Sequence, residues 1–182
     1  DIVECGVWKG GSSMMMACAL IHFGDTHRTI YLYDTYTGMT EPTKEDTRHS
    51  KDQWTATQKW KQLETTDHNE WCYAPIEEVQ KNLGTTGYPE KSVVFVKGKV
   101  EDTLPKTIPT TVALLRLDTD WYASTKHELQ HLFPILSQNG LLIIDDYGHW
   151  EGSKKATDEF FGEKPPFLAR IDGTCRVVIK TG

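Results

Sequence analysis

Short apolar segments alternate along the chain with segments of helical periodicity, and this alternation constrains the fold more than any other feature. The strand-like segments are residues 2–5, 29–33, 92–96, 112–117 and 140–144. Helices are expected from Ser12 or Ser13 to residue 23, and over 76–83, 124–136 and 153–161. Such alternation produces βαβ crossovers and a mainly parallel sheet, and the segments 167–171 and 175–179 predict a closing hairpin. We therefore predict an α/β fold: a doubly wound, mostly parallel seven-stranded Rossmann-like sheet with an antiparallel last strand.

The length of 182 residues suits one domain, which we take as 1–182. The chain begins at Asp1 without a Met and enters a strand-like segment at once, so we expect that an N-terminal part of the natural protein is missing. Residues 38–75 are polar but carry Trp54, Trp60 and Trp71. Exposed aromatic residues in an insertion of this length favour a lid or substrate insertion, and a solvated helical excursion is the alternative.

Charge and cysteine content exclude several classes of protein. The formal net charge is −6 and no basic run is present, which argues against a nucleic-acid partner. No apolar stretch is long enough to span a bilayer, so no membrane partner is expected either. The cysteines are widely scattered and form no C-x-x-C pair, as is typical of reduced thiols in a cytoplasmic protein.

The glycine-rich turn between the first strand and the first helix indicates a ligand that carries a nucleoside. Glycines allow the backbone to approach a ligand closely, and the start of a helix offers free N–H groups. The turn lacks the G-x-G-x-x-G spacing. It comes near the phosphate-binding G-x-x-x-x-G-K-[ST] pattern, but Ser12 stands where that pattern requires Lys, which argues against an NTPase. Asp34 ends the second strand, where a carboxylate can bind both hydroxyls of a ribose or cap the segment that follows.

Acidic residues gather at the ends of the predicted strands: Glu4, Asp34, Asp118, Asp120, Asp145 and Asp146. Ligands of open α/β sheets bind outside the carboxyl ends of the strands. If the strands that end in L-D-T-D-W-Y and I-I-D-D-Y-G are neighbours, three or four carboxylates converge. Such carboxylates repel one another unless protons or a cation intervene, and hard oxygen ligands favour Mg²⁺ over Zn²⁺. A purely structural acidic rim is the alternative.

Four stretches resemble the macrocin O-methyltransferase family, bacterial enzymes that methylate sugar hydroxyls of natural products. They are V-E-C-G-V-W-K-G-G, Y-D-T-Y-T-G-M, L-R-L-D-T-D-W-Y-A-S-T and I-I-D-D-Y-G, in the family's order, and the resemblance covers nearly the whole chain from residue 2. It implies a class I S-adenosylmethionine-dependent methyltransferase domain assisted by Mg²⁺. It also implies a sugar-containing small-molecule acceptor, and family members are often homo-oligomers.

The resemblance implies a role for each matching residue. Glu4 and Gly6 hold the amino-acid end of S-adenosylmethionine, Gly10, Gly11 and Ser12 shape the turn, and Asp34 binds the ribose. Gly98, Val100 and Glu101 border the adenine. Asp118, Asp145 and Asp146 are the metal ligands, with Asp118 also in the cofactor site, while Asp120 orients the loop.

The base that removes the acceptor's proton is left open by the sequence. Related catechol-type enzymes carry a Lys three residues after their first metal-binding Asp, and Trp121 stands there in this chain. Asp118 and His149 are the catalytic candidates, followed by His49 or His68 in the insertion. Two rival functions stay open: a metal-dependent glycosyltransferase that uses the D-x-D of L-D-T-D-W, and a non-catalytic cofactor-binding domain.

Overall fold

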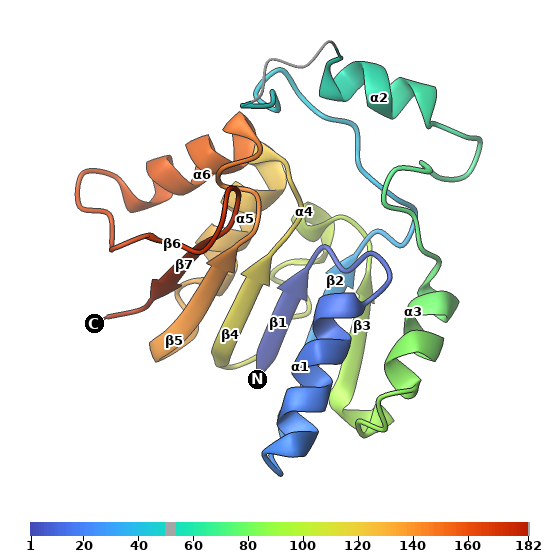
Figure 1. Ribbon diagram of the computed structural model, residues 1–182, viewed down its shortest axis with the longest axis vertical. Coiled ribbons are helices and arrows are strands. Elements are labelled where there is room, and N and C mark those ends of the chain that lie inside the picture. Colours follow the sequence, from blue (N-terminus) through green and yellow to red (C-terminus); the bar gives the residue numbers. More distant parts are fainter. Residues whose placement is uncertain (50–53, 182) are drawn as a thin grey trace.

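Seven strands form one twisted sheet in a computed structural model that describes residues 1–49 and 54–181 (Figure 1). The order across the sheet is β3-β2-β1-β4-β5-β7-β6. The strands are β1 (Ile2–Cys5), β2 (Ile30–Asp34), β3 (Val93–Lys97), β4 (Val112–Leu117), β5 (Leu136–Ile144), β6 (Ala169–Arg170) and β7 (Arg176–Ile179). The first five are paired in parallel, and β7 runs antiparallel to both β5 and β6. The predicted fold class is confirmed.

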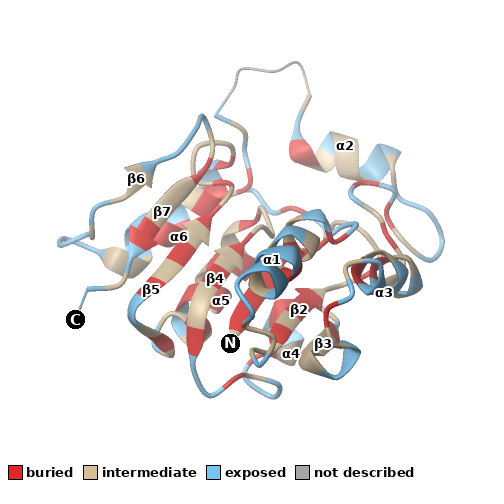
Figure 2. Cartoon of the chain, turned by 60° about the horizontal axis from the view of Figure 1, so that its bottom comes forward, coloured by how far each residue is buried: buried red, intermediate tan, exposed pale blue. Residues whose placement is uncertain are grey.

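Helices cover both faces of the sheet (Figures 1 and 2). Helices α1 (Gly11–His22) and α3 (Ile76–Gly84) pack on one face, where Ile2, Ile30 and Leu32 point. Helix α5 (Tyr122–Leu132) packs on the other face beside α4 (Val100–Thr103) and α6 (Glu151–Phe161). Within the described ranges, no helix is both long and apolar enough to cross a bilayer.

Element boundaries differ from the sequence prediction at several places. Helix α1 is capped by Gly10, at φ 84°, instead of Ser12 or Ser13, because the Ser13 hydroxyl donates to Glu4. Helix α5 begins at Tyr122 and ends at Leu132, so Leu136 belongs to β5. The short helix α4 was not predicted, and β6 is shorter than the expected strand 167–171.

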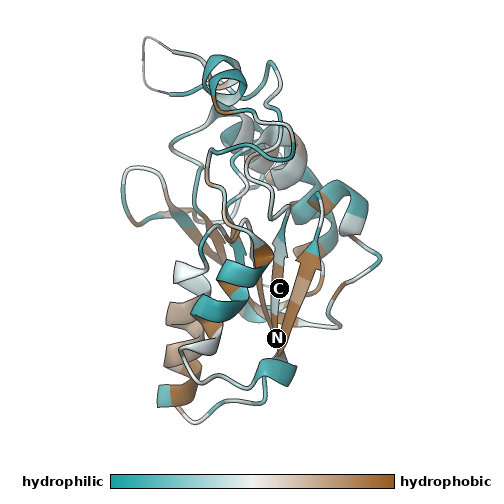
Figure 3. Ribbon diagram, turned by 90° about the vertical axis from the view of Figure 1, so that its right-hand side faces the viewer, coloured by the Kyte–Doolittle hydropathy of each residue, from teal (hydrophilic) through white to brown (hydrophobic). Residues whose placement is uncertain are grey.

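Aromatic residues anchor the 38–75 segment to the sheet. Residues 50–53 of this segment lie outside the described part of the chain. The expectation that its tryptophans are exposed is wrong: Trp71 is buried, and Trp54 and Trp60 are half-buried. They pack with Trp121 and Trp150, which follow β4 and β5 in the chain. The ribbon of this segment is coloured mainly from hydrophilic to neutral (Figure 3). Its one described helix is α2 (Ala56–Gln62).

Asp46 is a second anchor of this segment, and replacing Asp46 should loosen the segment. The buried carboxylate accepts hydrogen bonds from the amide and hydroxyl of Thr43 at 2.7 and 2.8 Å and from the Tyr122 amide at 2.7 Å. Each bond to a charged group contributes roughly 1.5–3 kcal/mol. We therefore expect Asp46→Ala to lower the melting temperature and to speed proteolysis within 38–75. The exposed Lys44→Ala is the control, and equal proteolysis of both variants would contradict this role.

Candidate active site

A cleft opens at the carboxyl ends of the central strands. Its empty volume, including the mouth that opens to solvent, is about 840 Å³. Six residues predicted to bind the cofactor line it: Gly6, Asp34, Gly98, Val100, Glu101 and Asp118. The cleft therefore joins the turn after β1 to the ends of β2, β3 and β4.

Four residues assigned to the cofactor by resemblance do not line this cleft: Glu4, Gly10, Gly11 and Ser12. Glu4 is buried behind it, where its carboxylate accepts from Ser13 and, at 2.8 Å, from Arg116. Gly10 caps α1, and Gly11 and Ser12 form its first turn. In the structure these residues shape the loop that carries Gly6.

Asp34 organises the loops on either side of the cleft. One carboxylate oxygen accepts from the amides of Val7 and Trp8 at 2.7 and 3.1 Å, and the other accepts from the Tyr36 amide at 2.7 Å. Asp34 therefore caps the turn after β2, and its carboxylate also holds the β1–α1 loop in place while lining the cleft.

Three carboxylates meet where β4 and β5 end. These strands are neighbours, and the pairing continues past them: the Asp118 amide donates to Cys5 of β1, and the Asp145 amide donates to Leu117 of β4. One oxygen each of Asp118, Asp145 and Asp146 lies within 4.8 Å of the others. Asp118 also lines the cleft, so the acidic group adjoins it directly.

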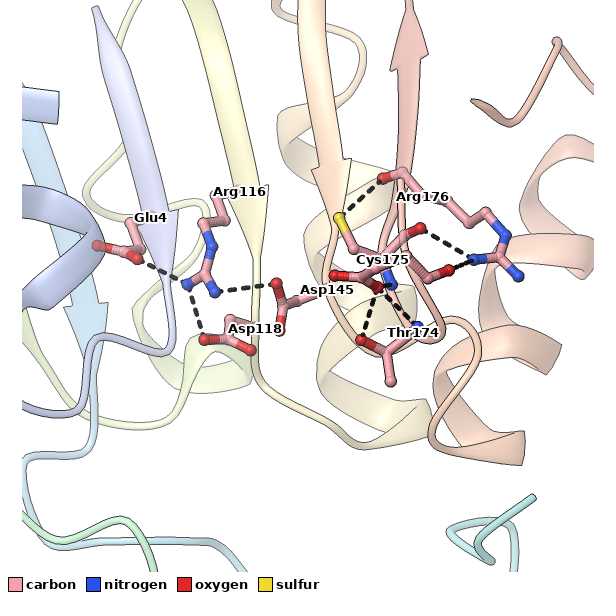
Figure 4. A network of polar contacts seen from close by, with 8 residues as sticks. Glu4, Arg116, Asp118, Asp145, Thr174, Cys175 and Arg176 are labelled. Atoms are coloured by element: carbon pink, nitrogen blue, oxygen red, sulfur yellow. Dashed lines mark hydrogen bonds and ion pairs between the residues drawn. The ribbon is translucent and has the colours of Figure 1, made fainter. Parts of the chain in front are cut away.

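Arg116 lies at the centre of this acidic group (Figure 4). Its guanidinium contacts Glu4 at 2.8 Å, Asp118 at 2.7 Å and Asp145 at 3.0 Å. Sequence reasoning missed it, although an arginine inside the apolar run V-A-L-L-R-L signals a buried ion pair. One cation faces four carboxyl groups when Asp146 is included, so full ionisation of the group would leave an excess of negative charge.

Burial and this crowding of carboxyl groups change the pKa values of Asp118 and Asp146. Burial, followed by the nearby Asp146 and Asp145, raises the pKa of Asp118 to about 9 even though Arg116 opposes the shift. Burial and the neighbouring Asp120 and Asp145 also raise the pKa of Asp146. One buried oxygen of Asp146 has no hydrogen-bond partner in the described protein. Such an atom points to a missing proton donor or cation.

Asp120 lies beside the other carboxylates and lines the same cleft as Asp118, but it is not one of the three whose oxygens lie within 4.8 Å of one another. It lies in the left-handed region at φ 66° and accepts a hydrogen bond from the Trp150 indole at 2.5 Å. Burial and the adjacent Asp118 raise its pKa to about 7. Asp120 thus links the loop after β4 to the aromatic cluster.

The candidate histidines lie outside the cleft lining. His149 is half-buried beside Trp150, and burial together with Arg48 lowers its pKa. His49 pairs with Glu151 at 2.5 Å, and His68 pairs with Glu70 at 2.9 Å. Of the four candidate bases, Asp118 is the one that lines the cleft.

Several cleft residues were not singled out from sequence: Trp8, Tyr33, Thr35, Gly38, Met39, Thr40, Cys72, Thr119 and Ser124. Thr35, Gly38 and Met39 lie in the stretch Y-D-T-Y-T-G-M, whose resemblance could have indicated them. Cys72 comes from the far end of the 38–75 segment and is brought to the cleft by folding alone. It lies close enough to Asp118 and Asp120 for burial and their charges to raise its pKa to about 11.

The sheet order, the antiparallel β7 and the cleft at the carboxyl ends of the strands define a class I methyltransferase fold. The structure of the O-methyltransferase NovP superposes on the whole chain with a TM-score of 0.82 and 29% identity, over 72% of that chain. The calicheamicin methyltransferase CalS11 shares the fold with a TM-score of 0.74 at 21% identity, covering 98% of this chain and 71% of that one.

The chain belongs to the macrocin O-methyltransferase (TylF) family, whose sequence pattern it matches over residues 1–178. It is 35% identical, over 96% of its length, to the 8-demethyl-8-(2,3-dimethoxy-alpha-L-rhamnosyl)-tetracenomycin-C 4'-O-methyltransferase of Streptomyces olivaceus. It is 32% identical, over 81% of its length, to the mycinamicin III 3''-O-methyltransferase of Micromonospora griseorubida. The chain spans 63% and 55% of these two relatives.

Proposed function

We propose that this chain is the core of an S-adenosylmethionine-dependent, Mg²⁺-assisted O-methyltransferase whose acceptor is a hydroxyl of a sugar-containing small molecule. The acceptor class follows the names of its relatives, which act on glycosylated natural products. The observation that carries the proposal is the acidic group Asp118, Asp145 and Asp146 directly beside the cleft. It supports the proposal because a metal bound by these carboxylates would lie next to a cofactor bound in the cleft.

The cleft residues fit S-adenosylmethionine. Asp34 has a carboxylate in the lining that suits ribose hydroxyls, and Gly98, Val100 and Glu101 form a wall beside it for a flat base. Gly6 has no side chain, so a ligand in the cleft can approach the backbone at the end of β1 closely. Once bound, this cofactor supplies a methyl group on a sulfonium, which an oxygen nucleophile attacks in line.

The acidic group fits a hard divalent cation. Its donors are all carboxylate oxygens, which Mg²⁺ prefers, and the unpartnered oxygen of Asp146 is available to a ligand. Arg116 occupies one oxygen each of Asp118 and Asp145 and leaves their second oxygens to a ligand. A cation there would lower the pKa of a bound acceptor hydroxyl and orient it.

We assign proton removal from the acceptor to Asp118, because its side chain lines the cleft. Burial raises the pKa of Asp118 to about 9, so this role requires the bound cation to restore the ionised form. His149 is the second candidate; the downward shift of its pKa favours the neutral, proton-accepting form. The aromatic cluster and Asp46 hold the 38–75 segment against the acidic end of the sheet, so that Met39, Thr40 and Cys72 line the cleft.

The rival glycosyltransferase is less well supported. Only the first Asp of L-D-T-D-W belongs to the three carboxylates that lie within 4.8 Å of one another, and Asp120 accepts a hydrogen bond from the Trp150 indole. The family match also favours methyl transfer. In a non-catalytic cofactor-binding domain without a metal, nothing would stabilise the buried, unpartnered oxygen of Asp146.

Calorimetry with S-adenosylhomocysteine tests the cofactor assignment. We expect binding by the wild-type chain and an affinity about 10–100-fold lower for Asp34→Asn, as for the loss of a charged hydrogen bond. Asp25→Asn, which changes an acidic residue paired with Arg28, is the control and should bind normally. Binding of a nucleotide sugar with no binding of S-adenosylhomocysteine would favour the glycosyltransferase instead.

A further inference from the structure

Glu128 is a fully buried carboxyl group on the helix that backs the cleft. It lies on the inner face of α5, one turn after Ser124, which lines the cleft. A buried carboxyl group costs several kcal/mol unless it is neutral or well bonded. A chain that needed only packing here could carry an apolar residue of the same size, so the group calls for an explanation.

Glu128 is bonded to the loop that carries the metal-binding candidates. The Thr119 hydroxyl lies 2.9 Å from one carboxyl oxygen of Glu128 and 3.1 Å from the other. Thr119 itself lines the cleft and stands between Asp118 and Asp120. The buried thiol of Cys5 is a further, weaker hydrogen-bond partner.

The two contacts to Thr119 form a reciprocal pair when Glu128 is neutral. The Thr119 hydroxyl then donates to one oxygen, and the carboxyl proton on the other oxygen donates back to the hydroxyl. Burial raises the pKa of Glu128 to about 8, which favours this neutral form at neutral pH. Such a pair fixes the rotamer of Thr119 in both directions.

The loop has further bonds that meet at the same residue. The Thr119 carbonyl accepts from the Trp121 amide at 2.7 Å and, more weakly, from the Ser124 hydroxyl at 3.4 Å. Asp120 beside it adopts the left-handed region, which is rare for a residue with a side chain. The hydroxyl and the carbonyl of Thr119 are therefore both hydrogen-bonded directly beside a residue in an unfavourable backbone conformation.

We infer that Glu128 is a positioning residue: through its reciprocal hydrogen-bond pair with Thr119, it holds Asp118 and Asp120 in the geometry that the metal and the cleft require. This inference rests on the proposed function for its consequence, since the residue being positioned belongs to the candidate metal site. It adds a buried residue that does not itself line the cleft.

Four variants test the pair. Glu128→Gln retains a carbonyl that accepts and an amide that donates, and Thr119→Ser retains the hydroxyl; both should bind Mn²⁺ within about twofold of wild type in calorimetry. Glu128→Met and Thr119→Val remove the pair, and each should weaken Mn²⁺ binding about 10–100-fold, as for other residues that orient metal ligands. The double variant Glu128→Met/Thr119→Val should be no weaker than either single variant.

Two further readouts separate positioning from folding and from the proposed function. Glu128→Met should not lower the melting temperature, because an apolar side chain replaces a buried carboxyl; affinity loss that only parallels a loss of stability would overturn the inference. Backbone amides of 118–121 should exchange with solvent about tenfold faster in Glu128→Met and Thr119→Val, with no ligand present. Unchanged exchange in both would also overturn it. If the wild-type chain binds no Mn²⁺, the metal part of the proposed function fails, and the exchange comparison still decides the inference.

Discussion

Asp146→Asn should lose Mg²⁺-dependent methyl transfer and gain thermal stability in EDTA. The variant keeps the shape of the side chain but removes the anionic donor, so activity should fall about 100–1,000-fold, the equivalent of several kcal/mol of metal assistance. Asp146 is buried, has one unpartnered oxygen and faces Asp120 and Asp145. In this account the protein tolerates that unfavourable arrangement because a cation relieves it.

The stability gain follows from the direction of the pKa shift. Burial raises the pKa of Asp146 in the folded state, so between the unfolded and folded pKa values the folded chain retains a proton that the unfolded chain has released. Stability is therefore lost as the pH rises through the unfolded pKa, and asparagine removes this loss. At neutral pH we expect the free energy of unfolding to rise by about 1 kcal/mol or more. Each kcal/mol corresponds to roughly 2–4 °C in melting temperature.

Asp67→Asn, an exposed carboxylate in the 38–75 segment, is the matched control and should change neither activity nor melting temperature. Mg²⁺ should raise the melting temperature of the wild type and of this control, but not that of Asp146→Asn. Full activity of Asp146→Asn, or of the wild type in EDTA, would contradict the metal assignment.

Gly6→Ala should destabilise the fold and displace the loop after β4. Gly6 has φ 80°, and an added Cβ would lie 2.0 Å from the Asp118 carbonyl oxygen. Backbone cannot yield as a flexible side chain can, so the ends of β1 and β4 must separate. Left-handed strain and overpacking each cost about 1–3 kcal/mol. We expect a total loss of about 3 kcal/mol, which corresponds to roughly 6–12 °C in melting temperature.

Gly24→Ala separates the two causes of that loss. Gly24 also has a positive φ, of 70°, but no atom lies within 4 Å of its added Cβ, so this variant suffers the backbone strain alone. It should lose only about 1 kcal/mol and should bind S-adenosylhomocysteine normally. Equal melting temperatures for Gly6→Ala and Gly24→Ala would show that the close approach of Gly6 to Asp118 does not matter.

The sheet could be predicted from sequence because its signals are local. Each strand is a short apolar run bounded by turn residues, and the order of strands and helices permits few topologies. The meeting of Asp118 with Asp145 and Asp146 followed from the same logic, since parallel neighbours end at one edge of a sheet.

What the sequence did not reveal depends on contacts between distant segments. Arg116 pairs with Glu4, a residue 112 positions away, and with Asp145 at the end of the neighbouring strand β5, besides its near neighbour Asp118. The tryptophans of the 38–75 segment looked exposed among polar residues, yet they pack on Trp121 and Trp150. Ser13 was a predicted helix cap, but its hydroxyl donates a hydrogen bond to Glu4 in the preceding strand instead. Periodicity records which face of an element is apolar and does not record its partners.

The most direct test of the central claim is a crystal structure obtained with S-adenosylhomocysteine and Mn²⁺, with the metal located by its anomalous signal. The account predicts one strong peak bound by Asp118, Asp145 and Asp146, next to a cofactor whose ribose contacts Asp34. A cofactor found in that cleft with the metal bound at other residues, or with no metal peak, would contradict it.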